Sequence, residues 1–125
     1  MRLCRLVGEY TVCKASLDEV KSTPFSFLSV TDREVSLLCR SEDVPATVTV
    51  REDGWRGFRI QGQLDFSLIG VLAELSGILA KEEIGIFVTS TYDTDYIFVK
   101  KENYARACDA LTRAGHIFID ESAGE

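Results

Sequence analysis

The chain has 125 residues, of which 46% are hydrophobic and 27% are charged, and its formal net charge is −6. These values are typical of a globular chain and exclude both a disordered protein and a membrane-protein composition. The Lys and Arg residues are scattered, whereas binding to a phosphate backbone depends on clustered positive charge, so we expect no nucleic-acid partner.

The N-terminal apolar stretch gives no sign of a targeting or membrane segment. Leu3–Val7 is interrupted by Arg5 and is far too short for the apolar core of a signal peptide or for a membrane span. We therefore expect a cytoplasmic protein with no membrane partner.

The cysteines and the single histidine do not form a metal-binding pattern. Cys4, Cys13, Cys39 and Cys108 lie far apart in the sequence, and His116 is the only histidine. Zinc ligands come in closely spaced pairs, so we expect no metal site and no cofactor. Apolar neighbours favour buried, structural cysteines, although the spacing alone leaves a disulfide open.

The first half of the chain contains short strand-like segments separated by turns. The elements that we expect there are a long or bent strand over Leu3–Ala15, a helical turn at Leu17–Lys21, a hairpin of Phe25–Thr31 and Glu34–Arg40 with its turn at Asp32–Arg33, a turn at Ser41–Val44, and a strand over Ala46–Arg51. With so little helix, one face of this sheet must be covered by the neighbouring unit or by another chain.

Two glycines mark the expected boundary between the halves. The segment Glu52–Gly57 contains Gly54 and Gly57, which favour turns, and its shortness indicates two tightly packed units. We therefore expect domains at residues 1–54 and 55–125.

The second half has a clearer pattern. The expected elements are a strand over Phe58–Leu64, an amphipathic helix over Ser67–Lys81 with Ser67 as N-cap, a hairpin of Ile84–Thr89 and Tyr96–Val99, a helix around Tyr104–Leu111 ending before a Gly115 cap, and a strand over His116–Ile119. The order β-α-β-β-α-β predicts a ferredoxin-like unit, and the first half repeats this order with very short helices. The fold class is therefore α+β, with tandem βαββαβ units.

The corner between the strand and the first helix of this half is a candidate anion site. Free N–H groups at a helix start could receive an α-carboxylate, and Gly70, placed in the first helical turn, would allow close approach of a ligand or of another backbone. A capped helix whose glycine packs against a strand explains the same residues.

The hairpin turn Ser90–Tyr96 carries two carboxylates, Asp93 and Asp95, which could pair with an ammonium or guanidinium group. A solvated turn is the alternative. His116 lacks catalytic neighbours in any known motif, and its position at a helix end explains it by the helix dipole. Sequence motifs of hydrolases, P-loop proteins, zinc proteases and dinucleotide-binding enzymes are absent from the chain, so we expect no enzymatic activity.

The runs Leu64–Ala73 and Ile84–Tyr96 resemble the ACT-domain family. More narrowly, they are similar to small bacterial proteins with two ACT-type units, related to the ACT domains of aspartate kinases and of the eukaryotic cytosolic arginine sensors. The resemblance covers about Trp55 to Ile119, and the first half looks like a degenerate first ACT unit.

This resemblance implies a non-catalytic regulatory protein that binds a free amino acid at an interface between ACT units. Carried over by motif, the ligand-binding residues are Asp65, Ser67, Leu68, Ile69 and Gly70 at the corner, the backbone of Ile86–Thr89, which includes Phe87, Val88 and Thr89, and Asp95, which matches an acidic position of the arginine sensors. The turn residues Tyr92, Asp93 and Thr94 differ from those sensors, so arginine specificity does not transfer.

A homodimer is expected if the first half supplies no second copy of the cleft, and the signal would pass to a regulated protein partner. The alternative is a structural oligomerisation module without a ligand.

Overall fold

The structure is a computed structural model that describes residues 1–62 and 70–120. Its chain forms two compact units, which are described separately. Unit 1 combines Met1–Val7 with the chain from Arg56 onward, and unit 2 is Gly8–Trp55. Residues 1–7 therefore group with the C-terminal half, whereas the expected domain boundary grouped them with residues 8–54.

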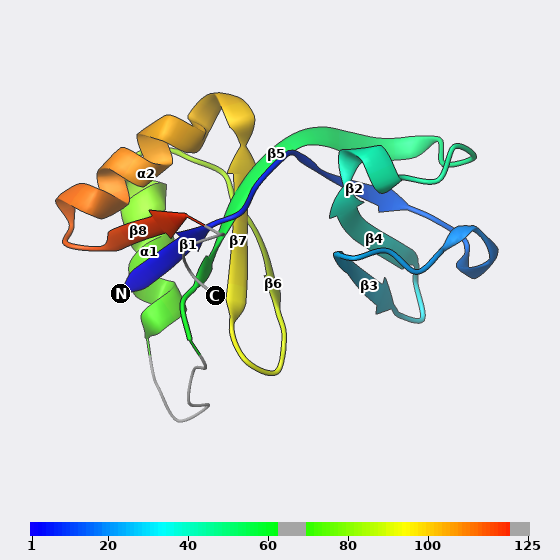
Figure 1. Cartoon of the computed structure of the whole chain (residues 1–125), viewed down its shortest axis with the longest axis horizontal. Helices are drawn as coiled ribbons and strands as arrows, with labels where there is room; N and C mark the ends of the chain where they lie inside the picture. Colours follow the sequence, from blue (N-terminus) through cyan, green and yellow to red (C-terminus); the bar gives the residue numbers. More distant parts are fainter. Residues whose placement is uncertain (63–69, 121–125) are drawn as a thin grey trace. The chain divides into compact units, whose positions relative to one another are not determined.

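Unit 1 has the βαββαβ order, with one additional strand (Figure 1). Its elements are β1 (Arg2–Arg5), the end of β5 (Val50–Ile60), α1 (Val71–Lys81), β6 (Phe87–Ser90), β7 (Asp95–Lys100), the short helix η3 (Lys101–Asn103), α2 (Tyr104–Arg113) and β8 (Ile117–Asp120). The strand order is β6-β7-β5-β1-β8. The ferredoxin-like α+β prediction is confirmed.

The additional strand is β1, which lies between β5 and β8. It pairs antiparallel with β5, where Leu3 faces Ile60, and parallel with β8, where Leu3 faces Phe118. Gly8 follows with φ 90°, a conformation that glycine adopts without strain, and the chain then enters unit 2. The segment Leu3–Ala15 is therefore two separate strands in different units.

The core of unit 1 lies between its sheet and its two helices. Both α1 and α2 contribute fully buried leucines, as the apolar spacing predicted, and these pack on side chains of the central strands. The buried members of this core are Leu3, Phe58, Ile60, Leu75, Leu79, Ile84, Ile97, Val99, Tyr104, Ala107, Cys108 and Leu111.

Unit 2 repeats the same strand topology with single-turn helices. Its elements are β2 (Tyr10–Lys14), η1 (Leu17–Glu19), β3 (Ser26–Val30), β4 (Val35–Arg40), η2 (Ser41–Asp43) and the start of β5, and its strand order is β3-β4-β2-β5. The hairpin predicted to turn at Asp32–Arg33 is confirmed, since the Thr31 N–H donates to the Glu34 carbonyl at 3.0 Å.

The expected turn at Glu52–Gly57 is wrong, and so is the expected strand over Ala46–Arg51. Strand β5 starts at Val50 and runs through both glycines to Ile60. Gly54, with φ 83°, lies where the pairing with β2 shifts register, which identifies a β-bulge. Gly57 permits close packing, because a Cβ atom there would lie 2.5 Å from Cδ1 of Phe98.

Candidate functional site

The candidate site lies at the end of the unit 1 sheet where β5 finishes. Thr94 Oγ1 donates to the Ile60 carbonyl at 2.9 Å, which attaches the β6–β7 turn to that end. The Gln61 N–H donates to the Arg2 carbonyl at 2.8 Å, and Arg2 is opposite Ile117 of β8. The sheet register therefore brings the β6–β7 turn, the end of β5 and the start of β8 to the same end of the sheet.

The first turn of α1 lies at the same end of the sheet. Glu74, in that turn, places Oε2 2.9 Å from Nε2 of His116, the residue before β8. The β6–β7 turn is therefore tied to the end of β5, and the first turn of α1 is tied to the start of β8.

Of the corner residues, Gly70 is described, whereas Asp65, Ser67, Leu68 and Ile69 lie outside the described residues. Gly70 is the N-cap of α1, so the expected N-cap at Ser67 and the placement of Gly70 inside the first turn are wrong. Its φ of 84° is left-handed, and a Cβ atom built on it would meet nothing within 4 Å. The backbone conformation, and not close packing, therefore explains glycine here.

Strand β6 carries Phe87, Val88 and Thr89, which are all half-buried and are paired with Phe98, Ile97 and Tyr96 of β7. Among the described strands β6 pairs only with β7, so its other side is an edge of the unit 1 sheet. A strand edge presents N–H and C=O groups that can bind a ligand or another chain.

Asp95 is the first residue of β7 and is half-buried. The Ser90 hydroxyl donates to its Oδ1 across the hairpin, which fixes the orientation of the carboxylate. Asp93, in contrast, is exposed at the turn. The two aspartates of this turn therefore differ in environment, and Asp95 is the better placed of the two for a specific contact.

Thr94 is a functional candidate that the sequence reasoning missed. Thr94 as a whole is 7% exposed, and its hydroxyl donates to the Ile60 carbonyl, as described above. Thr91 closes the turn, because its Oγ1 accepts from the Thr94 N–H at 3.3 Å. Threonines three residues apart in a polar turn are a sequence signal for this side-chain capping.

The thiols of the chain are poor nucleophiles. All four cysteines are buried and free. Burial raises the pKa of Cys13 and Cys108, and it raises the pKa of Cys39 to about 11. The reactive thiolate is therefore disfavoured in these three side chains. Within residues 1–62 and 70–120, no group of His, Cys, Asp and Glu is arranged to hold a metal ion.

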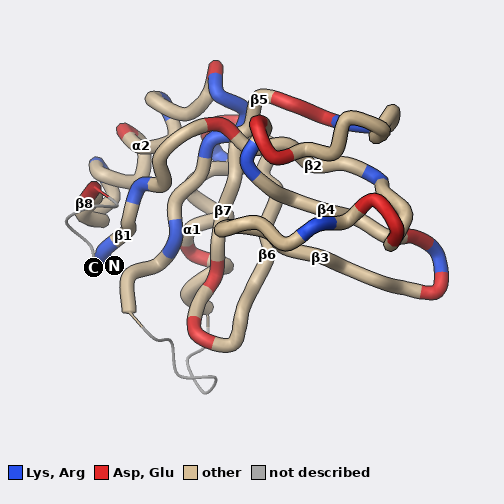
Figure 2. Tube along the Cα trace, turned by 45° about the vertical axis from the view of Figure 1, so that its right-hand side comes forward, with Lys and Arg blue, Asp and Glu red and all other residues tan. Residues whose placement is uncertain are grey.

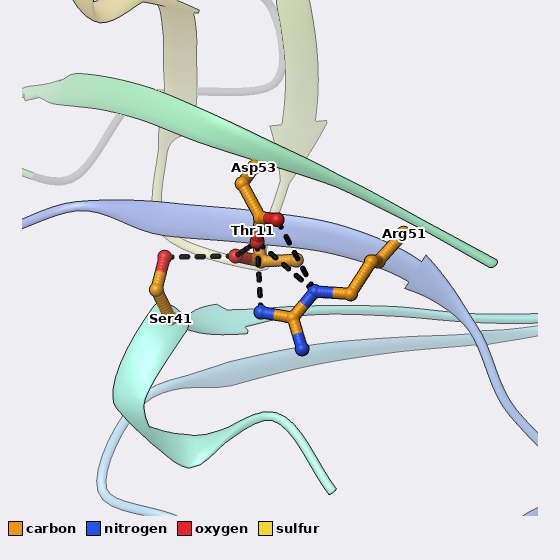
Figure 3. Close-up of polar contacts among 4 residues, drawn as sticks. All are labelled: Thr11, Ser41, Arg51 and Asp53. Atoms are coloured by element: carbon orange, nitrogen blue, oxygen red, sulfur yellow. Dashed lines mark hydrogen bonds and ion pairs between the residues drawn. The ribbon is translucent and has the colours of Figure 1, made fainter. Parts of the chain in front are cut away.

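Unit 2 contains a separate polar cluster (Figure 3). Fully buried Thr11 donates to Asp53 Oδ1 at 2.6 Å, and its Oγ1 lies 2.8 Å from Ser41 Oγ. Arg51 binds the same carboxylate, with its Nη2 2.8 Å from Oδ1. This network ties β2, β5 and η2 together, and its mutually satisfied groups indicate a structural role.

An open hollow of about 230 Å³ also lies in unit 2. Its lining combines apolar residues with charged side chains of both signs, and consists of Val12, Cys13, Lys14, Glu34, Ser36, Val50, Arg51 and Glu52. None of the predicted site residues that the structure describes belongs to it.

Within each unit, charged residues of both signs are interspersed along the chain (Figure 2). Strand β3 carries no charged residue, and neither does β6. In the described part of the chain, no helix has the length and apolar character needed to cross a membrane.

Among curated proteins, the chain is similar to subunit 1 of the cytosolic arginine sensor for mTORC1 of rat and of mouse. Each match is 28% identical over 102 residues and covers 76% of this chain. The match covers only 31% of each sensor, so this chain corresponds to less than a third of those proteins.

Among solved structures, an Agrobacterium tumefaciens protein matches with 30% identity and a TM-score of 0.83, covering 96% of this chain and 92% of its own. A Vibrio cholerae protein of unknown function matches with 22% identity and a TM-score of 0.74, covering 90% and 88%. The aspartate kinase of Clostridium acetobutylicum, at 11% identity and a TM-score of 0.65, shares the fold over 90% of this chain and 34% of the kinase.

A family model described as the ACT domain matches residues 50–113. These residues contain most of unit 1, including both helices and the hairpin with Asp95. The match extends over half of the chain and agrees with the βαββαβ topology. The chain belongs to the ACT domain family.

Proposed function

We propose that this protein is a non-catalytic, cytosolic regulatory module that binds a free amino acid at an interface between ACT units. The ligand lies at the end of the unit 1 sheet where β5 finishes. Its α-carboxylate binds the corner of Asp65, Ser67, Leu68, Ile69 and Gly70, and the backbone of Phe87–Thr89 lines the cleft. Asp95 binds a cationic group of the ligand.

The observation that carries this proposal is the placement of Asp95. Its carboxylate is oriented by Ser90, and the neighbouring Thr94 donates to Ile60 at the end of β5, the strand that leads to α1. The start of a helix favours an anion, and an aspartate favours a cation, so the two ends of a zwitterion have matching partners there. The similarity to an arginine sensor supports an amino acid as the ligand class.

We further propose that a second copy of the chain completes the cleft. The open edge of β6 carries no charge, so the net charge of −6 is not concentrated where two copies would meet. Ligand binding then changes this assembly and transmits the signal to a regulated protein partner.

Thermal-shift screening against the twenty amino acids tests the ligand proposal. A ligand at about 100 times its Kd stabilises the folded protein by roughly 2.7 kcal/mol, which is readily detected. The absence of stabilisation by any amino acid at millimolar concentration would contradict the proposal. Analytical ultracentrifugation with and without the active amino acid tests the dimer.

Asp95→Ala is the matching variant, with Asp93→Ala as its control. Loss of a charge-assisted hydrogen bond costs about 1.5–3 kcal/mol, so we expect affinity to fall by at least about tenfold in Asp95→Ala. Asp93→Ala, which changes an exposed aspartate of the same turn, should bind normally. Equal affinities of both variants and the wild type would exclude Asp95 from the site, whereas the absence of any binding by the wild type would favour a purely structural oligomerisation module.

A further inference from the structure

His116 connects three segments of unit 1 although it lies outside every predicted site. Its side chain is 3% exposed. Nδ1 is 3.0 Å from the Met1 nitrogen, next to β1, and Nε2 is 2.9 Å from Glu74 Oε2 in the first turn of α1. From the sequence, the helix dipole explained the position of His116 at a helix end, but the structure places its side chain between β1, β8 and α1.

The Met1 contact determines which ring nitrogen carries the proton. The Met1 nitrogen acts as a donor, so Nδ1 must accept and the ring proton must lie on Nε2. Nε2 is within ion-pair distance of Glu74, but the angle is not that of a hydrogen bond, and this buried nitrogen has no other partner among the described residues. Glu74 is therefore an electrostatic neighbour of this buried N–H and not its hydrogen-bond acceptor.

Glu74 is also the acidic residue of the first turn of α1. Its N–H donates to the Gly70 carbonyl at 2.9 Å, which closes that turn. A carboxylate near a helix start is attracted by the same free N–H groups that would bind a ligand carboxylate. The position of the Glu74 side chain therefore decides whether it competes with an incoming anion.

We propose that His116 is a positioning residue that holds Glu74 toward the start of β8, which fixes the first turn of α1 and keeps the Glu74 carboxylate from competing with the ligand carboxylate. The first part concerns the ligand-free protein. The second part rests on the proposed function, because it requires a carboxylate ligand at the corner.

Hydrogen exchange in the ligand-free protein tests the positioning. His116→Leu should accelerate exchange at the Glu74 and Leu75 amides by up to about fivefold, the effect of losing an electrostatic contact to a carboxylate that is 63% exposed. His116→Gln supplies an N–H at a similar reach and should restore slow exchange. Equal acceleration at Leu111 of α2 would mean global destabilisation and would overturn the proposal, as would unchanged exchange at both amides.

Glu74→Ala provides a second variant, since Glu74 is 63% exposed and its truncation leaves the core intact. If the two side chains act together, the double variant exchanges no faster at Leu75 than His116→Leu alone. Additive acceleration would overturn the pairing.

Ligand affinity tests the second part. We expect His116→Leu to bind the active amino acid about tenfold more weakly, and Glu74→Ala in the His116→Leu background to restore binding although it does not restore the lost contact. Failure of this restoration would overturn the competition with the ligand. If the wild type binds no amino acid, the proposed function fails, and hydrogen exchange still decides whether His116 positions α1.

Discussion

Replacement of Gly57 by alanine tests the close packing between β5 and β7. The added Cβ would lie 2.5 Å from Cδ1 of Phe98, which is fully buried, and 3.1 Å from the Ile97 carbonyl oxygen. Overpacking of this kind costs about 1–3 kcal/mol. The reduced freedom of the unfolded chain returns about 0.4–1 kcal/mol, so we expect a net loss of roughly 1–2 kcal/mol. Urea denaturation followed by circular dichroism measures this loss.

Gly77→Ala is the matched control for this variant. Gly77 lies in α1, is exposed, and has nothing within 4 Å of an added Cβ. Alanine should therefore stabilise the helix by about 0.5–1 kcal/mol. Phe98→Leu, which replaces the opposing ring by a smaller aliphatic side chain, should cost less stability in the Gly57→Ala background than in the wild type. If Gly57→Ala were as stable as the wild type, the inferred contact between Gly57 and Phe98 would be wrong.

Three further predictions concern individual contacts. Tyr104→Phe removes the 3.2 Å hydrogen bond from the phenol to the Gly57 carbonyl, so it should lower the free energy of unfolding by about 0.5–1.5 kcal/mol in urea titrations. Iodoacetamide at pH 8 should label the four cysteines slowly until urea unfolds the chain, because all are buried and the pKa of Cys39 is raised to about 11. Rapid labelling of the native protein, measured by mass spectrometry, would contradict this burial. The pKa of Glu19 is lowered mainly by the hydrogen bond from the Thr47 hydroxyl at 2.5 Å. The stability linked to this carboxylate is therefore present above its unfolded pKa and is lost as the pH falls through the folded pKa. An NMR titration should find the Glu19 pKa higher in Thr47→Ala, and an unchanged value would exclude this hydrogen bond.

Local periodicity was sufficient to predict both helices and both hairpins. Leu75 and Leu79 of α1 are buried at the expected spacing of four, as are Tyr104 and Leu111 of α2 at seven. The reason is that an amphipathic helix must bury one stripe of side chains whatever the rest of the chain does. The paired order of segments then indicated the ferredoxin-like topology.

Features that depend on distant residues could not be predicted in this way. Gly57 was interpreted as a turn residue because the Phe98 ring that demands its small size lies 41 positions further along the chain. The assignment of β1 to unit 1 depends on its pairing with Ile60 and Phe118. A glycine has no side chain to reveal its environment, and a short apolar strand fits many partners.

The candidate site was predictable in part. Polar residues in a short turn indicated Asp95, and the structure adds that Ser90 and Thr94 hold this turn in place. The placement of Gly70 inside the first helical turn was wrong, because its positive φ at the N-cap follows from the backbone path and not from residue type. The link between Glu74 and His116 joins positions 42 residues apart, and no local pattern marks it.

The position of β1 in the unit 1 sheet has a consequence for folding during synthesis. This strand leaves the ribosome before its partners Phe58–Ile60 and Ile117–Asp120, which follow it at long sequence separations. Unit 2, which is continuous in sequence, can form while β1 is still unpaired. Such distant pairing slows folding, and a fragment that starts at residue 55 would lack the strand that joins β5 to β8.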